Sequence, residues 1–387
     1  MKDRIRDVLF VTGTRADFGK LKPLMQEIEA DPAFRAHIFV TGMHMLSRYG
    51  STVNEVYRAG FSSIHPFINQ DSAAPSQMDL VLADTVRGLA HFVREFPPDL
   101  LVVHGDRIET LAGAMVGALN NILVAHVEGG ELSGTVDELI RHAVSKLAHL
   151  HFVANDEAKG RLLQMGEHPE AVYAIGSPDV DVMLSQALPD LDEVRVHYDI
   201  PFADYGILIY HPVTTELGLI ARRAQDVVEA IIRSGRDFIV IHPNNDPGRD
   251  LIMLALQRLQ GDPHIRFLPS MRFEAFLVLL RHADVIVGNS SAGIREAPVF
   301  GVPTINLGSR QLNRFRYQSI TNLPEEAEAI LAALSHLPGR FPATDHFGDG
   351  RSAERFIAAL RDPALWATSP QKQFRDDTRG GPGAVSG

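Results

Sequence analysis

The chain has 387 residues, 45% hydrophobic and 22% charged, the composition of a globular protein long enough for two domains. Its formal net charge of −11 argues against a nucleic-acid partner, because such binding needs a basic face. There are no cysteines, which excludes disulfides, thiolate metal sites and thiol nucleophiles. The opening MKDRIRDVLFVTG lacks the apolar core of a signal peptide, and no stretch is apolar enough to span a bilayer. We therefore expect a cytoplasmic protein that has no membrane partner.

The first half of the chain alternates short apolar runs with amphipathic stretches, which is the pattern of a parallel sheet covered by helices. The apolar runs predict strands at 8–12, 37–41, 100–104, 122–127, 151–154 and 172–175. The amphipathic stretches predict helices at 20–30, 79–95, 109–119, 136–148 and 157–165.

Acidic and polar residues interrupt this pattern at 189–201. The alternation then restarts with predicted strands at 207–210, 238–241, 265–268, 285–287 and 304–307. The sequence thus predicts an α/β protein of two doubly wound Rossmann-like domains, at 1–190 and 201–362, with a ligand in the cleft between them. The polar tail at 369–387 is expected to be disordered.

The motif GTRADFGKLKPL, at 13–24, directly follows the first predicted strand. A glycine-led turn before a helix leaves backbone N–H groups that can bind an anion. Arg15 adds a planar cation suited to phosphate, and Lys20 and Lys22 add two point charges. An ordinary structural turn with solvated basic residues explains the same pattern.

Two further motifs place carboxylates behind strands. HGDRIET puts Asp106 and Arg107 at a strand exit, where Asp106 is either an acid/base group or the N-cap of the next helix. HVEGGELSGTVDELIRHAVSKLAH places Glu128 and Glu131 on either side of two glycines, and Asp137 one turn before Arg141. Three carboxylates near glycines favour a site over a solvated loop with a helical ion pair.

His149 and His151 stand two apart on a predicted strand, and we interpret them as structural because two histidines alone do not form a metal site. The HEXXH and DxDxDG patterns are absent, so no metal is expected.

In the second half, polar residues again follow predicted strands. HPVTTE, HPNNDPG and VGNSSAGIREAPVFGVPTINLGSRQ contribute His211, Asn244, Ser290, Ser291, Glu296 and Arg310. Hydroxyls and N–H groups at a helix start suit a diphosphate, and a glutamate within the helix can accept hydrogen bonds from ribose hydroxyls. Ordinary helix capping is the alternative for the serines.

Together these motifs resemble those of the UDP-N-acetylglucosamine 2-epimerases. The resemblance covers about residues 5–362 and rests on GTRADFGKLKPL, HGDRIETL, the HVEGGE segment, HPVTTE, LPSMRFEAF and the GNSSAG segment. GTRAD at 13–17 and HVEGGE at 126–131 favour the hydrolysing branch, which forms free N-acetylmannosamine for sialic-acid-type sugars; non-hydrolysing relatives show a GTRPE-type opening and HVEAG.

The resemblance implies a glycosyltransferase-B-like fold, a UDP-sugar substrate, no cofactor, and a homo-oligomer (dimer or tetramer). It assigns nucleotide binding to Arg15, Gly19, Arg107, His211, Asn244, Ser290, Ser291, Glu296 and Arg310. It assigns acid/base roles to Asp106, Glu128 and Asp137, with His211 also assisting catalysis.

The implied reaction removes the C2 proton while UDP leaves C1, which gives a glycal; water then adds at C1 and a proton reaches the opposite face of C2. Such chemistry needs one ionised and one protonated carboxyl group. It also needs cations for the leaving diphosphate, which Arg15, Arg310 and a protonated His211 would supply.

Three alternatives stay open. The same chemistry can act on UDP-2,4-diacetamido-2,4,6-trideoxyglucose, as in a legionaminic-type pathway. A glycosyltransferase of this fold would need an acceptor and leave C2 untouched. A non-catalytic nucleotide-sugar sensor is disfavoured by the presence of Asp106, Glu128, Asp137 and His211.

Overall fold

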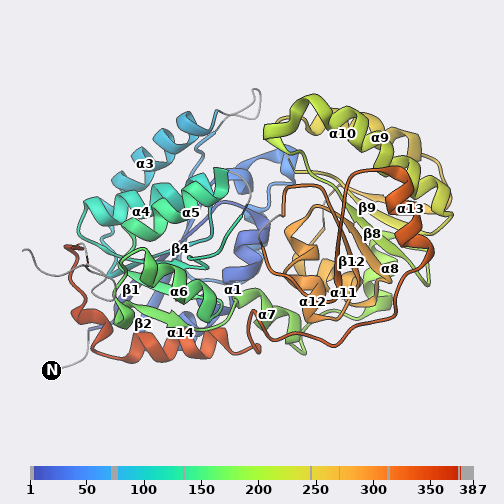
Figure 1. Cartoon of the computed structure of the whole chain (residues 1–387). Helices are drawn as coiled ribbons and strands as arrows, with labels where there is room; N and C mark the ends of the chain where they lie inside the picture. The colour runs from blue at the N-terminus through green and yellow to red at the C-terminus, as the bar shows by residue number, and fades with distance from the viewer. Residues whose placement is uncertain are drawn as a thin grey trace, which may run out of the picture. The chain divides into compact units, whose positions relative to one another are not determined.

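The computed structural model describes residues 4–70, 77–133, 136–244, 246–269, 271–311, 314–373 and 375. The chain forms two compact units, each containing a parallel sheet (Figure 1). Unit 1 comprises Met1–Glu131, Val136–Val182 and His346–Gly387, and unit 2 comprises Leu132–Thr135 and Met183–Asp345. The predicted α/β class with two Rossmann-like units is confirmed.

The described part of unit 1 contains a seven-stranded parallel sheet in the order β3-β2-β1-β4-β5-β6-β7. Its strands are β1 (Arg6–Thr12), β2 (Phe34–Val40), β3 (Ile64–Pro66), β4 (Leu100–His104), β5 (Leu123–Val127), β6 (Leu150–Val153) and β7 (Val172–Ala174). The order reverses between β1 and β4, so the ends of these two strands flank the switch point where α/β sheets bind ligands.

Helices cover both faces of this sheet, because successive residues of a strand point to opposite sides. The helices of unit 1 are α1 (Arg15–Ala30), α2 (Val53–Arg58), α3 (Met78–Glu95), α4 (Ile108–Leu119), α5 (Val136–Leu147), α6 (Asp156–Gln164) and α14 (Ser352–Arg361), and α7 (Pro178–Leu184) starts in unit 1 and ends just past its limit at Val182. Val8 and Phe10 of β1 pack with α1 and α14, while Leu9 and Val11 pack with α3, α4 and α5 on the other face (Figure 1).

Helix α14 belongs to unit 1, whereas the sequence analysis placed it in the second domain at 201–362. The reason is packing: Phe356, Ile357 and Leu360 lie on one helical face and are buried in the same cluster as Phe10 and Leu21. The chain therefore comes back to unit 1 after completing unit 2, which the order of strands and helices along the sequence does not indicate.

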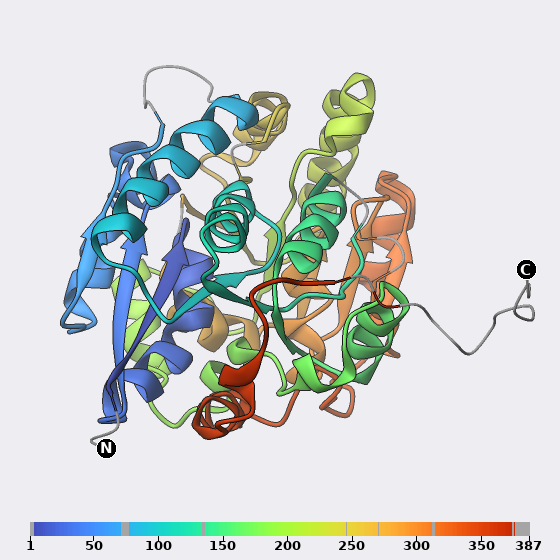
Figure 2. The same cartoon turned by 90° about the vertical axis from the view of Figure 1, so that its left-hand side faces the viewer.

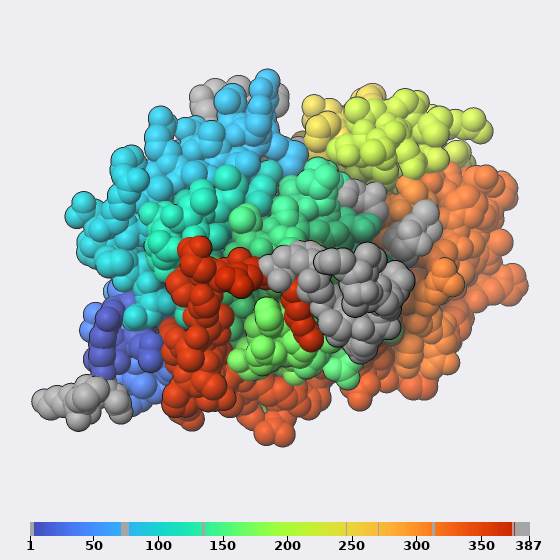
Figure 3. Space-filling model, turned by 60° about the vertical axis from the view of Figure 1, so that its left-hand side comes forward, coloured from blue at the N-terminus to red at the C-terminus, as the bar shows by residue number. Residues whose placement is uncertain are grey.

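The segment after α14 also differs from the prediction of a disordered tail from 369. Lys372 donates hydrogen bonds from Nζ to the carbonyls of Ser145 (3.0 Å) and Ala148 (2.6 Å), and Pro370 accepts one from His149. Figures 2 and 3 show this red segment on the surface of unit 1. The rest of the predicted tail, residue 374 and residues 376–387, lies outside the described part of the chain.

The described part of unit 2 contains a six-stranded parallel sheet in the order β10-β9-β8-β11-β12-β13. Its strands are β8 (Gly206–Ile209), β9 (Phe238–Ile241), β10 (Ile265–Leu268), β11 (Val285–Gly288), β12 (Thr304–Leu307) and β13 (Ile320–Leu323). Its helices are α8 (Leu191–Tyr198), α9 (Leu217–Ser234), α10 (Arg249–Leu256), α11 (Phe273–His282), α12 (Glu296–Val299) and α13 (Ala327–Ser335). None of the described helices of either unit is long and apolar enough to cross a membrane.

Candidate functional site

Two side-chain hydrogen bonds cap the first turn of α1. Thr14 is the N-cap, and its Oγ1 accepts a hydrogen bond from the backbone N–H of Asp17 (3.1 Å). Asp17 in return accepts one from the N–H of Gly13 through Oδ2 (3.1 Å). This reciprocal arrangement starts the helix at Arg15, five residues before the predicted 20–30, so Gly19 lies buried inside α1. Arg15 forms an ion pair with Glu55 of α2.

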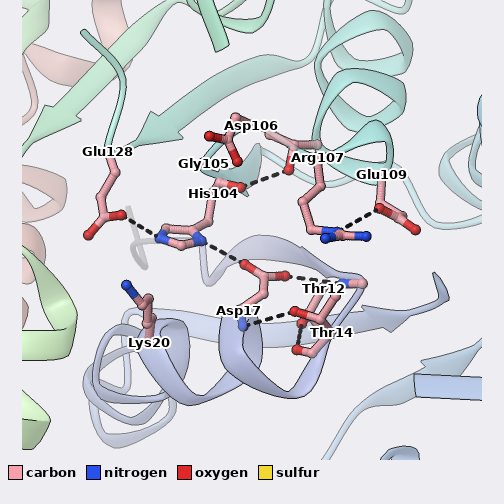
Figure 4. Close-up of polar contacts among 12 residues, drawn as sticks. Thr12, Thr14, Asp17, Lys20, His104, Gly105, Asp106, Arg107, Glu109 and Glu128 are labelled. Atoms are coloured by element: carbon pink, nitrogen blue, oxygen red, sulfur yellow. Dashed lines mark hydrogen bonds and ion pairs between the residues drawn. The ribbon is translucent and has the colours of Figure 1, made fainter. Parts of the chain in front are cut away.

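His104, the last residue of β4, lies between two carboxylates (Figure 4). Its Nδ1 is 2.7 Å from Oδ1 of Asp17, and its Nε2 is 3.0 Å from Oε2 of Glu128. Each ring nitrogen thus faces a hydrogen-bond acceptor, so both nitrogens must donate. Only the protonated imidazolium form carries a hydrogen on both nitrogens. Burial by itself would lower the pKa of His104, but Glu128 and Asp17 together raise it to about 10. His104 is therefore a buried cation at neutral pH.

Glu128 follows β5 in a left-handed backbone conformation with φ of +62°, which is uncommon for a residue other than glycine. Its N–H donates to the carbonyl of Phe152 (2.9 Å), and its side chain is held at both oxygens. Oε2 faces His104, and Oε1 accepts a hydrogen bond from the hydroxyl of Ser177. Backbone strain that the surroundings hold in place is a recognised mark of functional positions.

Asp106 lies in the turn after β4, where Oδ2 forms an ion pair with Arg141 of α5. Arg107, not Asp106, occupies the N-cap position of α4 and makes no capping bond, so the capping alternative for Asp106 is wrong. Asp137 stands in the first turn of α5, four residues before Arg141, and the two share a helix face. The side chain of Arg107 is 47% exposed, with Nε 3.7 Å from Oε2 of Glu109.

A second buried histidine holds the turn that carries Asp106. His126 of β5 is fully buried, donates from Nε2 to the carbonyl of Gly105 (2.8 Å) and contacts the hydroxyl of Ser145 at 3.0 Å. Burial lowers its pKa to about 3, so this ring is neutral. His126 thus links β5, α5 and the turn after β4 without adding charge.

His149 and His151 have structural partners. The ring of His149 accepts a hydrogen bond from the N–H of Val124 (3.0 Å), and His151 lies 2.9 Å from Glu167. The described residues contain no group of three or more histidine, aspartate or glutamate side chains arranged to hold a metal ion.

In unit 2 the buried Asn289 organises the predicted residues. Its side chain accepts a hydrogen bond from the N–H of His211 (2.7 Å) and donates one to the carbonyl of His211 (2.9 Å). Its own carbonyl accepts from Arg310 (3.2 Å) and from Gln311 (2.9 Å). The N–H of Asn244 donates to Nδ1 of His211 (3.1 Å), which brings three predicted residues together.

The surroundings of His211 within unit 2 disfavour the protonated ring that was expected from the sequence. Burial, assisted by the nearby charge of Arg310, lowers the pKa of His211 to about 3. Because Nδ1 accepts the hydrogen bond from Asn244, the proton of the neutral ring sits on Nε2. In these surroundings the neutral ring of His211 can donate one hydrogen bond, from Nε2.

The NSS segment that follows β11 starts a short helical turn. Ser290 is the N-cap of this turn, and its Oγ accepts a hydrogen bond from the N–H of Ala292 (3.3 Å). The alternative role given for the serines, ordinary helix capping, is therefore confirmed for Ser290. Ser291 is the first residue of that turn, and Glu296 begins α12 with its side chain buried. Gly288 has φ of +129°, and a Cβ there would lie 1.9 Å from the carbonyl oxygen of Ile209, which requires glycine before this segment.

Comparison with known proteins points to one family. The model of the UDP-N-acetylglucosamine 2-epimerase family matches residues 26–361. The chain is 49% identical over 377 residues to the UDP-N-acetylglucosamine 2-epimerase of Neisseria meningitidis, covering 96% of this chain and 99% of that protein. It is 35% identical over 362 residues to the UDP-N,N'-diacetylbacillosamine 2-epimerase (hydrolyzing) of Legionella pneumophila, covering 92% and 96%.

Solved structures agree on the fold. The UDP-GlcNAc 2-epimerase from Neisseria meningitidis bound to UDP-GlcNAc matches with a TM-score of 0.77 at 18% identity, over 92% of this chain and 99% of that one. The Methanocaldococcus jannaschii UDP-GlcNAc 2-epimerase in complex with UDP-GlcNAc and UDP matches with a TM-score of 0.78 at 21% identity and the same coverage.

Proposed function

The chain belongs to the UDP-N-acetylglucosamine 2-epimerase family, and from this premise we propose that it converts UDP-N-acetylglucosamine and water into N-acetylmannosamine and UDP. In this reaction a base takes the C2 proton, the electron pair forms the C1–C2 double bond, and the C1–O bond to UDP breaks. Water then adds at C1 and a proton enters the opposite face of C2. The 49% identity over nearly the whole chain favours this sugar over other substrates.

The observation that carries the proposal is the setting of Glu128. A general base must be ionised, and a buried carboxylate stays ionised only when charged or hydrogen-bonding groups compensate its burial. The imidazolium of His104 and the hydroxyl of Ser177 provide that compensation at the two oxygens of Glu128. We therefore propose Glu128 as a group that moves the C2 proton.

Asp106 and Asp137 are proposed as the other acid/base groups. Asp106 follows the same β4 strand that ends in His104, and its ion pair with Arg141 connects it to the helix that carries Asp137. Two carboxyl groups in different electrostatic surroundings can hold different protonation states, as the two proton transfers require.

For nucleotide binding, we propose Arg15, Gly19 and Arg107 in unit 1. In unit 2 we propose the set His211, Asn244, Ser290, Ser291, Glu296 and Arg310. Asn289 supports this second set through its bonds to His211 and Arg310. The arginines Arg15 and Arg310 are proposed to supply positive charge for the leaving diphosphate. The cytoplasmic location and the homo-oligomer expected from the sequence stay predictions.

The test is turnover of UDP-N-acetylglucosamine in D₂O followed by NMR. We expect UDP and free N-acetylmannosamine that carries deuterium at C2. A parallel assay with UDP-2,4-diacetamido-2,4,6-trideoxyglucose tests the substrate, because the Legionella relative is named for a diacetamido sugar. Faster turnover of that sugar would reassign the substrate. Transfer of the sugar to an acceptor with the C2 proton retained, or binding without UDP release, would refute the proposed activity.

A further inference from the structure

The segment GSPDVD, at 176–181, leads into α7 and contacts Glu128 through Ser177, and none of the catalytic or binding roles proposed above is assigned to it. We propose that Ser177 in this segment is a positioning residue for Glu128, holding one oxygen of its carboxylate while His104 holds the other. This inference rests on the acid/base role proposed above for Glu128.

Ser177 is itself held rigidly. Its side chain is fully buried, its hydroxyl donates to Oε1 of Glu128, and its backbone N–H donates to the carbonyl of Phe347 (2.6 Å). The preceding Gly176 has φ of +92°, and a Cβ there would lie 3.3 Å from Cα of Gly348. This close backbone approach ties the start of α7 to the segment by which the chain re-enters unit 1.

The next polar residues of the segment anchor α7 at two more places. Asp179 forms a buried ion pair with Lys20 of α1 (2.8 Å). Asp181 accepts hydrogen bonds from the N–H groups of Ser352 (2.9 Å) and Ala353 (2.8 Å) at the start of α14. The hydroxyl of Ser177 is therefore presented from a helix turn that is fixed on three sides.

These contacts close into a ring. Glu128 contacts His104, His104 contacts Asp17, and Asp17 lies one helical turn before Lys20 on α1. Lys20 contacts Asp179, and the turn of α7 leads back through Ser177 to Glu128. In Figure 4 the amine of Lys20 lies on the side of His104 where Glu128 stands. The ring couples α1, β4, the end of β5 and α7 around one carboxylate.

We expect the contact with Ser177 to determine the orientation of the Glu128 carboxylate, whereas the charged partner His104 keeps that carboxylate ionised. With the Ser177 hydroxyl removed, Glu128 keeps its imidazolium partner at Oε2 but loses the hydrogen bond that positions Oε1. Misplacing a catalytic group by about 1 Å costs up to about 100-fold in rate, while substrate binding that uses other groups is retained. A positioning role therefore predicts a loss in kcat with little change in KM.

The test compares Ser177→Ala and Ser177→Thr with the unaltered enzyme in the UDP-release assay. We expect Ser177→Ala to lower kcat about 10- to 100-fold with KM within about 3-fold, which is the range for losing a hydrogen bond to a charged group. Ser177→Thr keeps a hydroxyl and should recover most of the rate. Ser352→Ala is the matched control: it removes another buried serine hydroxyl beside α7 but keeps the N–H bond to Asp181, and its rate should stay near wild type.

Circular dichroism and a thermal melt establish that each variant is folded. If Ser177→Ala does not fold, Ser177→Cys takes its place, because a thiol fills the position but donates only weakly; the kcat of Ser177→Cys should then also fall. A folded Ser177→Ala or Ser177→Cys with wild-type kcat would overturn the inference, as would equal losses in Ser177→Ala and Ser352→Ala. If the unaltered enzyme shows no C2 exchange, the proposed function fails and the inference with it; an active enzyme that is insensitive at Ser177 refutes the inference alone.

Discussion

Replacing His104 by glutamine removes the cation from between Asp17 and Glu128 and leaves two acidic side chains around a neutral amide. The side chains of His104, Asp17 and Glu128 are 9%, 12% and 7% exposed, so water screens their interaction weakly. Removing one partner from a buried charge cluster typically costs about 3–5 kcal/mol, because it leaves an uncompensated charge. We expect His104→Gln to fold less stably and to lose most activity.

The sign of the pH dependence separates this charge effect from lost packing. The pKa of His104 is raised in the folded protein from 6.5 to about 10, so folding favours the protonated ring. The stability that it contributes is fully present below pH 6.5 and is lost as the pH rises toward 10. The loss is about 1.4 kcal/mol for each pH unit in that interval. In the glutamine variant this contribution does not exist at any pH.

The assay is chemical unfolding of both proteins at intervals between pH 6 and pH 10. The difference in unfolding free energy between wild type and His104→Gln should be largest near pH 6 and shrink steadily above pH 6.5. His264→Gln, which alters an exposed histidine paired with Asp237, is the control and should show a small difference throughout. A His104→Gln difference that stays constant from pH 6 to pH 10 would refute an imidazolium at this position.

Three further predictions follow from the same geometry. Arg15→Ala should weaken UDP binding about 10- to 100-fold, the loss of about 1.5–3 kcal/mol from a charge-assisted contact; unchanged affinity by titration calorimetry would place the phosphates elsewhere. Activity should persist after exhaustive treatment with EDTA, and a loss restored by one divalent ion would contradict this. Nitrogen NMR of the His211 ring should show the neutral form from pH 5 to pH 8, because burial lowers its pKa to about 3; a protonated ring at pH 6 would contradict its burial.

Much of the fold could be predicted from apolar runs. The strands at 100–104, 238–241, 265–268 and 304–307 match β4, β9, β10 and β12 residue for residue. The strands β3 and β13 were missed because both are short edge strands with partly exposed residues, and β3 ends in a proline. The early start of α1 was missed because it depends on two hydrogen bonds, from the N–H of Asp17 to Thr14 Oγ1 and from the N–H of Gly13 to Asp17 Oδ2.

The candidate site was predicted in part. The carboxylates followed strands and stood in recognisable motifs, so Asp106, Glu128 and Asp137 were named. His104 was not named. It stands in the same HGDRIET motif as Asp106, which could have pointed to it, but it is also the last residue of an apolar run and was assigned to the core strand. Its partner Asp17 lies 87 positions away, and Ser177 lies 49 positions from Glu128. Pairings over such distances depend on how the strands are ordered in the sheet, which periodicity does not determine.

In the proposed reaction the buried carboxylate Glu128 moves the C2 proton of the sugar. The most direct measurement is UDP release and C2 deuterium exchange in the folded variant Glu128→Gln, compared with Asp106→Asn and Asp137→Asn. An amide keeps the size and much of the hydrogen bonding but cannot transfer the proton, so turnover should fall by at least about 10²- to 10⁴-fold. A variant that blocks only one of the two proton transfers should still release UDP slowly and leak the glycal. Near-wild-type rates of both reactions in folded Glu128→Gln would contradict this role, whatever the other two variants do.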